Sequence, residues 1–202
     1  MVLIKNIFNL NTVYIIAVII ALGSLLIPKG IELYNLQVQG ISYVANDVEK
    51  YHNNAHPVEG EYAVTIDLSD LASNEGKVLF DDGENKIYLS EVIVHSEAEY
   101  EFFFRSRGRY SLGGASLVSG VTHTYYNGGF NSSLQAEVKA SYKGETHELS
   151  PSGSSGLNYR DGDEFGFYLD FTDDIILDLK EEVMVDVTVT NLFVNLWAKK
   201  TR

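Results

Sequence analysis

Acidic side chains gather in two segments of the sequence, and loop carboxylates are the oxygen ligands that calcium prefers. The first segment is Asp81-Asp82-Gly83-Glu84-Asn85, whose Asp-Gly step equally suits an ordinary hairpin turn. The second segment is denser, and its acids repel one another unless something neutralises them. Its members are Asp161, Asp163, Glu164, Asp170, Asp173 and Asp174. We take this second set as the tentative calcium site, with turn chemistry as the alternative for both segments.

Three arginines alternate along one short segment, at positions Arg105, Arg107 and Arg109. One extended strand would place all three on the same face, whereas a turn at Gly108 would leave only the first two aligned. Guanidinium groups bind carboxylates and phosphates through paired hydrogen bonds. The pattern predicts an anion-binding stripe for a neighbouring subunit's acids, a lipid headgroup or an acidic glycan. Pairing with acids of the same chain is the alternative.

The last apolar segment, residues 183–197, alternates valine with polar residues and then becomes apolar on both faces. A single strand of that length would span roughly 50 Å, which is far longer than usual. The segment therefore passes from one sheet to another, is buried on both faces at its end, or pairs with a neighbouring subunit. In the last case Phe193 and Trp197 are the expected partner contacts.

The sequence contains no motif of a nucleophilic, phosphate-binding or metalloprotease site. His52 and His56 lie four residues apart, with Glu49 three residues earlier, and would share a face if they lay on a helix. Pro57 disfavours that geometry, so exposed loop histidines are the simpler interpretation. We predict no catalytic residue, no enzymatic activity and no cofactor other than possible calcium.

Composition restricts the classes of partner. The formal charge is −13, and cysteine is absent, which removes disulfides and thiolate chemistry. Residues 1–30 hold two lysines and no acid, so the remainder carries −15. An acidic surface repels phosphate, and we therefore predict no nucleic-acid binding.

One apolar segment indicates a membrane location. The 23 residues between Lys5 and Lys29 carry no charge, and about 20 such residues in a helix cross the hydrocarbon core. We expect an uncleaved anchor, although Ala21-Leu22-Gly23 also fits a signal-peptidase site. Lys5 and the amino terminus favour a cytoplasmic N-terminus and an extracytoplasmic C-terminal domain.

Beyond residue 60 the hydrophobic period is two. About ten short strands are separated by turns such as Asp82-Gly83, Asn127-Gly128 and Lys143-Gly144. This pattern predicts a mainly β fold, an antiparallel β-sandwich or jelly roll, preceded by one transmembrane helix.

Residues 31–59 are ambiguous because apolar residues recur at both helical and strand spacing. We expect a strand over 34–44 and a helical turn over 45–52. The predicted organisation is therefore an anchor over 1–30, a linker with a first strand over 31–59, and an extracytoplasmic β-sandwich over 60–202.

The apolar helix with Pro28 near its end, followed by a β-rich domain, resembles the layout of type IV pilins. The processing glycine and the glutamate of that family have no counterpart at Asn9, Leu10, Asn11 and Thr12. No residue role follows from this resemblance.

Three function classes fit these features. The first is a membrane-anchored structural or assembly subunit of a surface filament, an envelope lattice or a virion, which self-associates or binds another surface protein. The second is a surface-displayed ligand-binding or adhesion module for glycan or calcium. The third, and the least supported, is an accessory subunit of a membrane enzyme.

Overall fold

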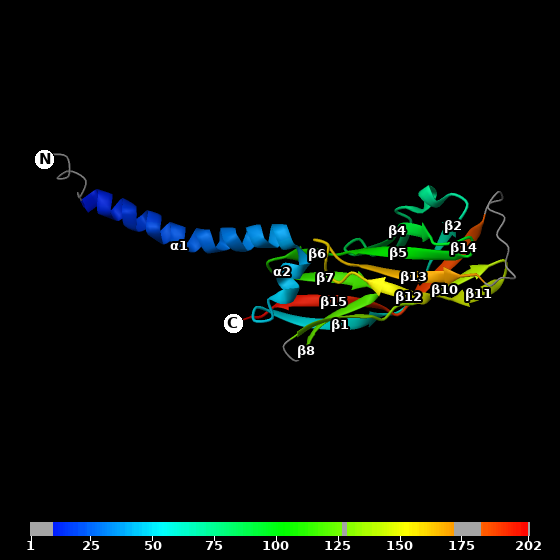
Figure 1. Cartoon of the computed structure of the whole chain (residues 1–202). Coiled ribbons are helices and arrows are strands. Elements are labelled where there is room, and N and C mark those ends of the chain that lie inside the picture. The colour runs from blue at the N-terminus through cyan, green and yellow to red at the C-terminus, as the bar shows by residue number, and fades with distance from the viewer. Residues whose placement is uncertain (1–9, 127–128, 172–182, 202) are drawn as a thin grey trace.

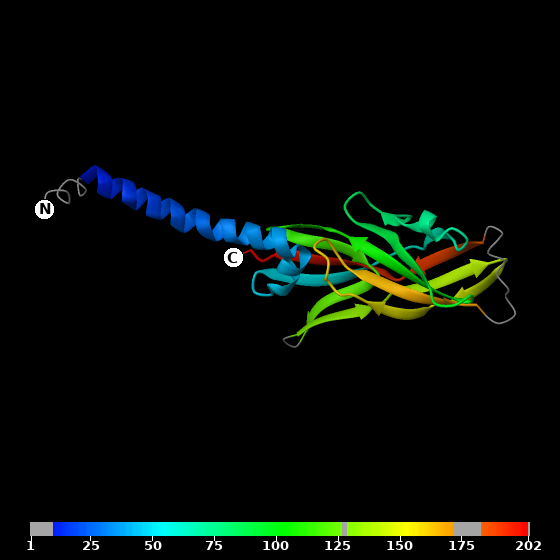
Figure 2. The same ribbon diagram turned by 45° about the horizontal axis from the view of Figure 1, so that its top comes forward.

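A long helix stands outside an elongated β-domain (Figure 1). The structure, a computed structural model, describes residues 10–126, 129–171 and 183–201. In both ribbon views the helix leaves one end of the domain, and the last residues of the chain lie at that same end (Figure 2). The prediction of a mainly β, antiparallel fold behind one apolar helix is confirmed.

Helix α1 (Leu10–Gln39) is long and apolar enough to cross a membrane, and its most apolar part is not buried against the domain. It ends at Gly40, whose φ of 62° is left-handed, and a short helix α2 (Ile41–Asn46) follows. The expected strand over 34–44 and helical turn over 45–52 are therefore wrong. The helical spacing was the true signal, because Leu36, Ile41 and Val44 pack together at the base of the domain.

Two antiparallel sheets pack face to face over the main core. The β14 sheet has the order β11 (Glu145–Glu148), β10 (Glu137–Tyr142), β14 (Met184–Thr190) and β2 (Tyr62–Asp67). The β5 sheet has the order β12 (Ser150–Ser154), β13 (Glu164–Asp170), β5 (Glu99–Arg107), β4 (Lys86–Val94) and β3 (Val78–Asp81). A short 3-10 helix, η1 (Leu71–Asn74), connects β2 to β3. Alternating valines of β14 and phenylalanines of β5 and β13 fill the space between the sheets.

A third sheet, the helix-proximal sheet, lies at the end that carries α1. Its order is β1 (Tyr51–Val58), β15 (Leu192–Lys199), β7 (Gly114–Ser119) and β6 (Arg109–Ser111). A second, smaller core lies between this sheet and the helices, where Tyr51, Leu117 and Trp197 join residues of α1 and α2.

The expected 15-residue final strand is two strands that belong to different sheets. β14 ends at Thr190, Asn191 turns the chain with a φ of 56°, and β15 continues in the helix-proximal sheet. Asparagine tolerates this left-handed conformation better than most residues. β15 lies between β1 and β7. Both edges of β15 are thus paired within the chain, so β15 offers no free edge to a neighbouring subunit. The segment passes from one sheet to another, which was the first of the three alternatives.

The predicted hairpins are present. β3 pairs with β4, β10 pairs with β11, and β8 (Val121–Tyr126) pairs with β9 (Gly129–Leu134). Lys143 and Gly144 both have positive φ, as the turn between β10 and β11 requires. The apolar run at 174–179, expected to form a strand, lies outside the described residues.

Candidate functional site

Asp161 brings two of the predicted sites together. Arg105 Nη2 donates a hydrogen bond of 2.6 Å to Asp161 Oδ1, and Arg107 Nε lies 3.3 Å from Asp161 Oδ2. The Arg105 guanidinium also lies over the ring of Tyr159, 3.3 Å from its centroid. Burial raises the pKa of the Tyr159 hydroxyl. The arginine stripe and the acidic segment thus satisfy each other within the chain, which was the alternative interpretation.

Arg109 separates from the other two arginines because the chain leaves the β5 sheet at Gly108 and enters the helix-proximal sheet. Gly108 is required there, since a Cβ would overlap the carbonyl oxygen of Ser116. Arg109 Nη1 lies 2.5 Å from Glu84 Oε1, and its side chain is 65% exposed. Only Arg105 and Arg107 remain aligned.

The other acids of the tentative calcium set have separate surroundings. Asp163 is buried, Glu164 Oε2 accepts a hydrogen bond of 3.1 Å from Ser90 Oγ, and Asp170 is exposed at the end of β13. Asp173 and Asp174 lie outside the described residues. Within the described ranges, no three His, Asp or Glu side chains are grouped so that they could hold a metal ion.

The first acidic segment forms a turn. Asp82 Oδ1 accepts hydrogen bonds of 2.8 Å and 2.6 Å from the amides of Glu84 and Asn85. Burial alone would raise the pKa of Asp82, but the amide hydrogen bonds outweigh it and lower the pKa. His52 and His56 lie exposed on strand β1, where the helical spacing needed for a shared metal is absent.

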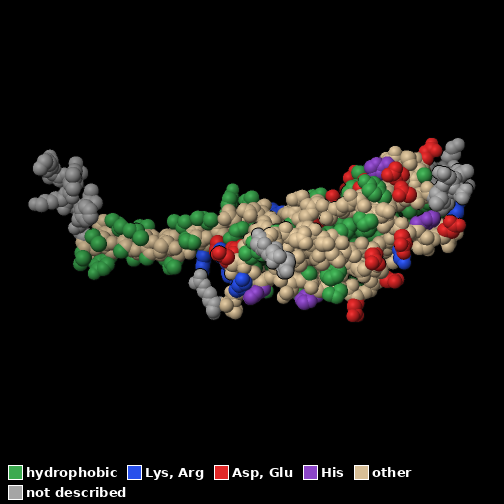
Figure 3. All heavy atoms as spheres, turned by 60° about the horizontal axis from the view of Figure 1, so that its bottom comes forward, with side chains coloured by type: hydrophobic (Ala, Val, Ile, Leu, Met, Phe, Trp, Pro, Cys, Tyr) green, Lys and Arg blue, Asp and Glu red, His purple; other side chains and the backbone are tan. Residues whose placement is uncertain are grey.

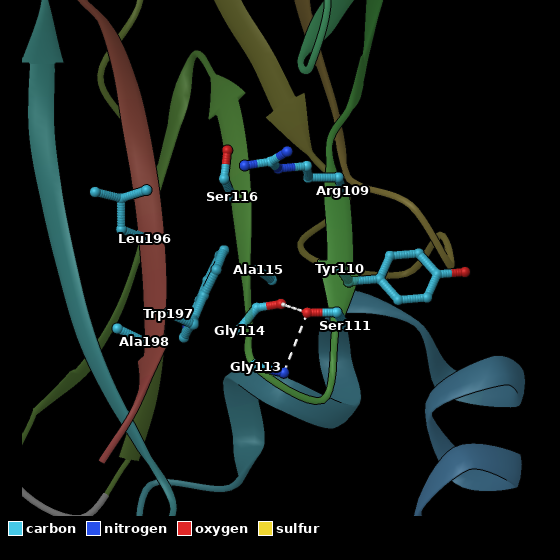
Figure 4. A pocket seen from close by; sticks show the side chains of 10 residues that line it. All are labelled: Arg109, Tyr110, Ser111, Gly113, Gly114, Ala115, Ser116, Leu196, Trp197 and Ala198. Carbon is cyan, nitrogen blue, oxygen red and sulfur yellow. Dashed lines mark hydrogen bonds between the residues drawn. The ribbon is translucent and has the colours of Figure 1, made fainter. Parts of the chain in front are cut away.

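A groove of about 520 Å³ opens beside the helix-proximal sheet, and two predicted contact residues line it (Figure 4). Arg109 extends from β6 toward Ser116 on β7, while Tyr110 points to the opposite side. Trp197 forms part of the wall from β15; it is only 2% exposed, and its indole Nε1 has no hydrogen-bond partner among the described residues. The other predicted contact, Phe193, is half-buried in β15.

A buried polar network, which no sequence motif announced, lies where the β8–β9 hairpin meets the sandwich. His123 and Asp163 have no exposed surface, and His123 Nε2 lies 2.6 Å from Asp163 Oδ2. Ser119 Oγ lies 2.9 Å and 2.7 Å from the two oxygens of the same carboxylate. On the other side of the ring, His123 Nδ1 lies 2.9 Å from Ser132 Oγ.

Asn195 holds the histidine strand in place. Its Oδ1 accepts a hydrogen bond of 2.8 Å from the backbone amide of His123, and its Nδ2 donates one of 2.9 Å to the carbonyl of Val121. The residues come from four distant segments, so no local spacing could reveal the network. The available signals are a histidine within a predicted strand, β8, and an asparagine within the mostly apolar strand β15.

Comparisons with family models, with curated proteins and with solved structures found no match to this chain.

Proposed function

We propose that this chain is a membrane-tethered structural subunit that displays its β-domain outside the cytoplasm and assembles through contacts between copies. The observation that carries the proposal is the apolar surface of α1, which continues past the length that a membrane needs. Leu10 to Ile27 covers roughly 27 Å of helix, close to the hydrocarbon thickness of about 30 Å. The helix then continues beyond Lys29 to Gln39.

The part of α1 beyond Lys29 carries exposed apolar side chains outside the expected bilayer. They are Ile31, Leu33, Tyr34 and Val38, each more than half exposed. Figure 3 shows hydrophobic side chains along both edges of the projecting helix. Apolar surface of this kind on a helix marks an interaction site.

A second copy is the occupant that fits this surface. Copies anchored in one membrane share one orientation, so identical segments lie at the same height and meet side by side. The only charged residue between Gly30 and Gln39 is Glu32. It pairs with Lys50, whose Nζ lies 3.1 Å from Glu32 Oε1 and 3.2 Å from Asp47 Oδ2. The hydrogen bonds from Lys50 to Glu32 and to Asp47 raise the pKa of Lys50, so the lysine keeps its positive charge beside Glu32.

Disulfide crosslinking tests the contact, because the natural chain has no cysteine. Tyr34→Cys and Val38→Cys, each in the full-length chain in native membranes, should give a crosslinked dimer on mild oxidation. Thr146→Cys is the matched control: it is exposed on β11, at the far end of the domain in Figure 1, and should stay monomeric. Equal yields at positions 34, 38 and 146, or no dimer at any of them, would contradict the proposal.

The same Thr146→Cys variant tests the orientation. A membrane-impermeant maleimide added to intact cells should label it, because the domain lies outside the cytoplasm. Labelling only after the cells are lysed would place the domain in the cytoplasm.

The second candidate function is a displayed ligand-binding module, favoured by the groove in Figure 4. Arg109 supplies a cation, which would exchange Glu84 for the ligand, and Trp197 forms part of the groove wall. These groups suit an acidic glycan. Calorimetry with a glucuronate oligosaccharide should show binding that Arg109→Met abolishes and Arg107→Met, outside the groove, retains. Absence of heat with the wild-type chain rejects this candidate.

A further inference from the structure

We propose that Ser132 is a nucleophilic serine, activated by His123 and Asp163, that reacts with small carboxylic esters. This inference is independent of the proposed assembly, because none of the residues that line the cavity belongs to α1. It follows from the direction of the hydrogen bonds around His123, from the strand register that fixes them, and from a cavity that Ser132 lines while His123 and Asp163 do not.

The hydrogen bonds assign the protons. An ionised carboxylate only accepts, so His123 Nε2, 2.6 Å from Asp163 Oδ2, carries the proton of the neutral ring. His123 Nδ1 is then the acceptor, and the Ser132 hydroxyl, 2.9 Å away, donates to it. This polarity lets an imidazole withdraw the proton of a serine during attack while a carboxylate stabilises the resulting imidazolium. The serine uses Nδ1 and the acid uses Nε2, and either ring nitrogen is able to act as the base.

The fold holds these groups rigidly. His123 on β8 and Ser132 on β9 lie directly opposite each other in the antiparallel register. The Phe130 ring stacks on the His123 ring, with centroids 5.9 Å apart and planes 15° apart. Asp163 is fixed through its backbone, whose carbonyl accepts a hydrogen bond of 3.0 Å from the amide of Ser106. Ser119 is a positioning residue, because it donates to the Asp163 carboxylate and its Oγ accepts from the amide of Val121.

A nucleophile must be reached by the substrate, whereas the base and the acid behind it need not be exposed. His123 and Asp163 are fully buried, whereas Ser132 is partly exposed and lines a cavity of about 260 Å³. The cavity lies between the β8–β9 hairpin, α2 and the loop before β13, and polar side chains of Ser42, Asn46 and Asn158 line it. Gly156 lies beside the serine, and a Cβ there would stand 3.8 Å from Ser132 Oγ, at ordinary van der Waals distance. A cavity of this size accommodates a short acyl group.

The reaction balances without any group beyond water. Ser132 Oγ attacks the ester carbonyl carbon, and its proton moves to His123 Nδ1. The carbon–oxygen bond to the leaving alcohol breaks, and that oxygen takes the proton from Nδ1. Water then attacks the acyl-serine, gives a proton to Nδ1 and releases the carboxylic acid, and the proton returns to Ser132 Oγ.

A fluorophosphonate probe tests the serine in the full-length chain in detergent. The wild-type chain should be labelled, with the adduct mapped by mass spectrometry to Ser132, and Ser132→Ala should lose at least tenfold of the labelling. Ser133→Ala is the matched control and should label like wild type, because the Ser133 side chain is exposed and accepts a hydrogen bond from Gln135, away from His123. An unlabelled wild-type chain, or equal labelling of Ser132→Ala, overturns the proposal.

A second measurement does not depend on the size of the probe. In this cysteine-free chain, Ser132→Cys introduces a single thiol beside His123 Nδ1, and iodoacetamide at neutral pH should alkylate it at least tenfold faster than the thiol of Ser133→Cys. A purely structural hydrogen bond at Ser132 predicts no such difference. Equal or slower alkylation of Ser132→Cys contradicts activation by His123, and circular dichroism checks that each variant keeps its β-structure.

Discussion

Gly40 lies directly against the carbonyl group of Arg160, so closely that a Cβ on residue 40 would overlap the carbonyl oxygen. The backbone amide of Ile41 donates a hydrogen bond of 2.9 Å to this same oxygen. The backbone amide of Gly40 donates a hydrogen bond of 2.8 Å to the carbonyl oxygen of Leu36. The projecting helix is therefore joined to the domain by a glycine that is both left-handed and in backbone contact.

Replacing Gly40 by alanine should lower the free energy of unfolding by more than about 2 kcal/mol, because left-handed strain and overlap with Arg160 add together. Gly76→Ala is the matched control. Gly76 also has positive φ, but the space around its Cβ position is open. Its replacement should therefore lower the free energy of unfolding by about 1–2 kcal/mol, the cost of left-handed strain alone. Chemical unfolding of the full chain in detergent measures both. Equal losses at the two positions would mean that the Arg160 contact is unimportant.

Trp197 should tolerate phenylalanine better than alanine. Trp197→Ala removes a nearly fully buried ring from the second core, and the cost should be about 3–5 kcal/mol of unfolding free energy. Trp197→Phe keeps much of the packing and removes an N–H group that has no described partner, so its cost should be clearly smaller.

Leu196→Ala, at the more exposed neighbouring position, controls for truncation of β15 and should change the free energy by less than about 1 kcal/mol. Thermal unfolding in detergent compares the three variants. Similar melting temperatures for Trp197→Ala and Leu196→Ala would show that the second core adds little stability.

Arg105 and Arg109 should differ in their contribution to stability. Arg105 is largely buried and combines the Asp161 ion pair with stacking on Tyr159; Arg105→Met should cost about 2 kcal/mol. Arg109→Met should cost less than about 1 kcal/mol, because the Arg109–Glu84 pair is exposed. Unfolding by urea at low and high salt measures both losses, and only the Arg109 loss should shrink with salt.

Asp67 should make the domain less stable in acid. The hydrogen bond from the Ser69 hydroxyl, together with the amides of Ser69 and Asp70, lowers the pKa of this carboxyl. A lowered folded-state pKa adds stability above the unfolded value of about 3.9, and this stability is lost as pH falls through the folded-state pKa.

The difference in unfolding free energy between wild type and Asp67→Asn should therefore be largest near pH 6 and shrink toward pH 3. Glu61→Gln, at an exposed carboxylate, controls for the removal of one negative charge. A difference that stays constant over this pH range would rule out the titration of Asp67 as its cause.

The periodic parts of the fold were predictable from sequence, whereas the junctions between elements were not. Alternating valines and the Lys143-Gly144 turn report local structure, and the structure has strands and a hairpin there. The change of sheet at Asn191 depends on packing between sheets, which local alternation does not encode. The sequence predicts a strand over 34–44 because Gly40 weakens the helical pattern, while the contact of Ile41 with Arg160 exists only in three dimensions.

The candidate site shows the same limit. The charge of Asp163 and its acidic neighbours in sequence predict a shared site, yet its side chain contacts His123 and Ser119, which are 40 and 44 residues away. The sequence suggests Arg105 as a binder of an external anion, whereas the carboxylate that it contacts, Asp161, belongs to the chain itself. Sequence identified reactive residue types in these cases, and only the fold determined which of them meet.

The pairing of β1 with β15 has a mechanical consequence. β1 follows the two helices along the chain and is matched to β15 over eight residue pairs, from Tyr51–Lys199 to Val58–Leu192. Figure 1 shows both strands running along the long axis of the domain, in line with the direction in which α1 leaves it. A pull between α1 and the far end of the domain therefore loads these hydrogen bonds together in shear, so they resist as a group and cannot open one after another.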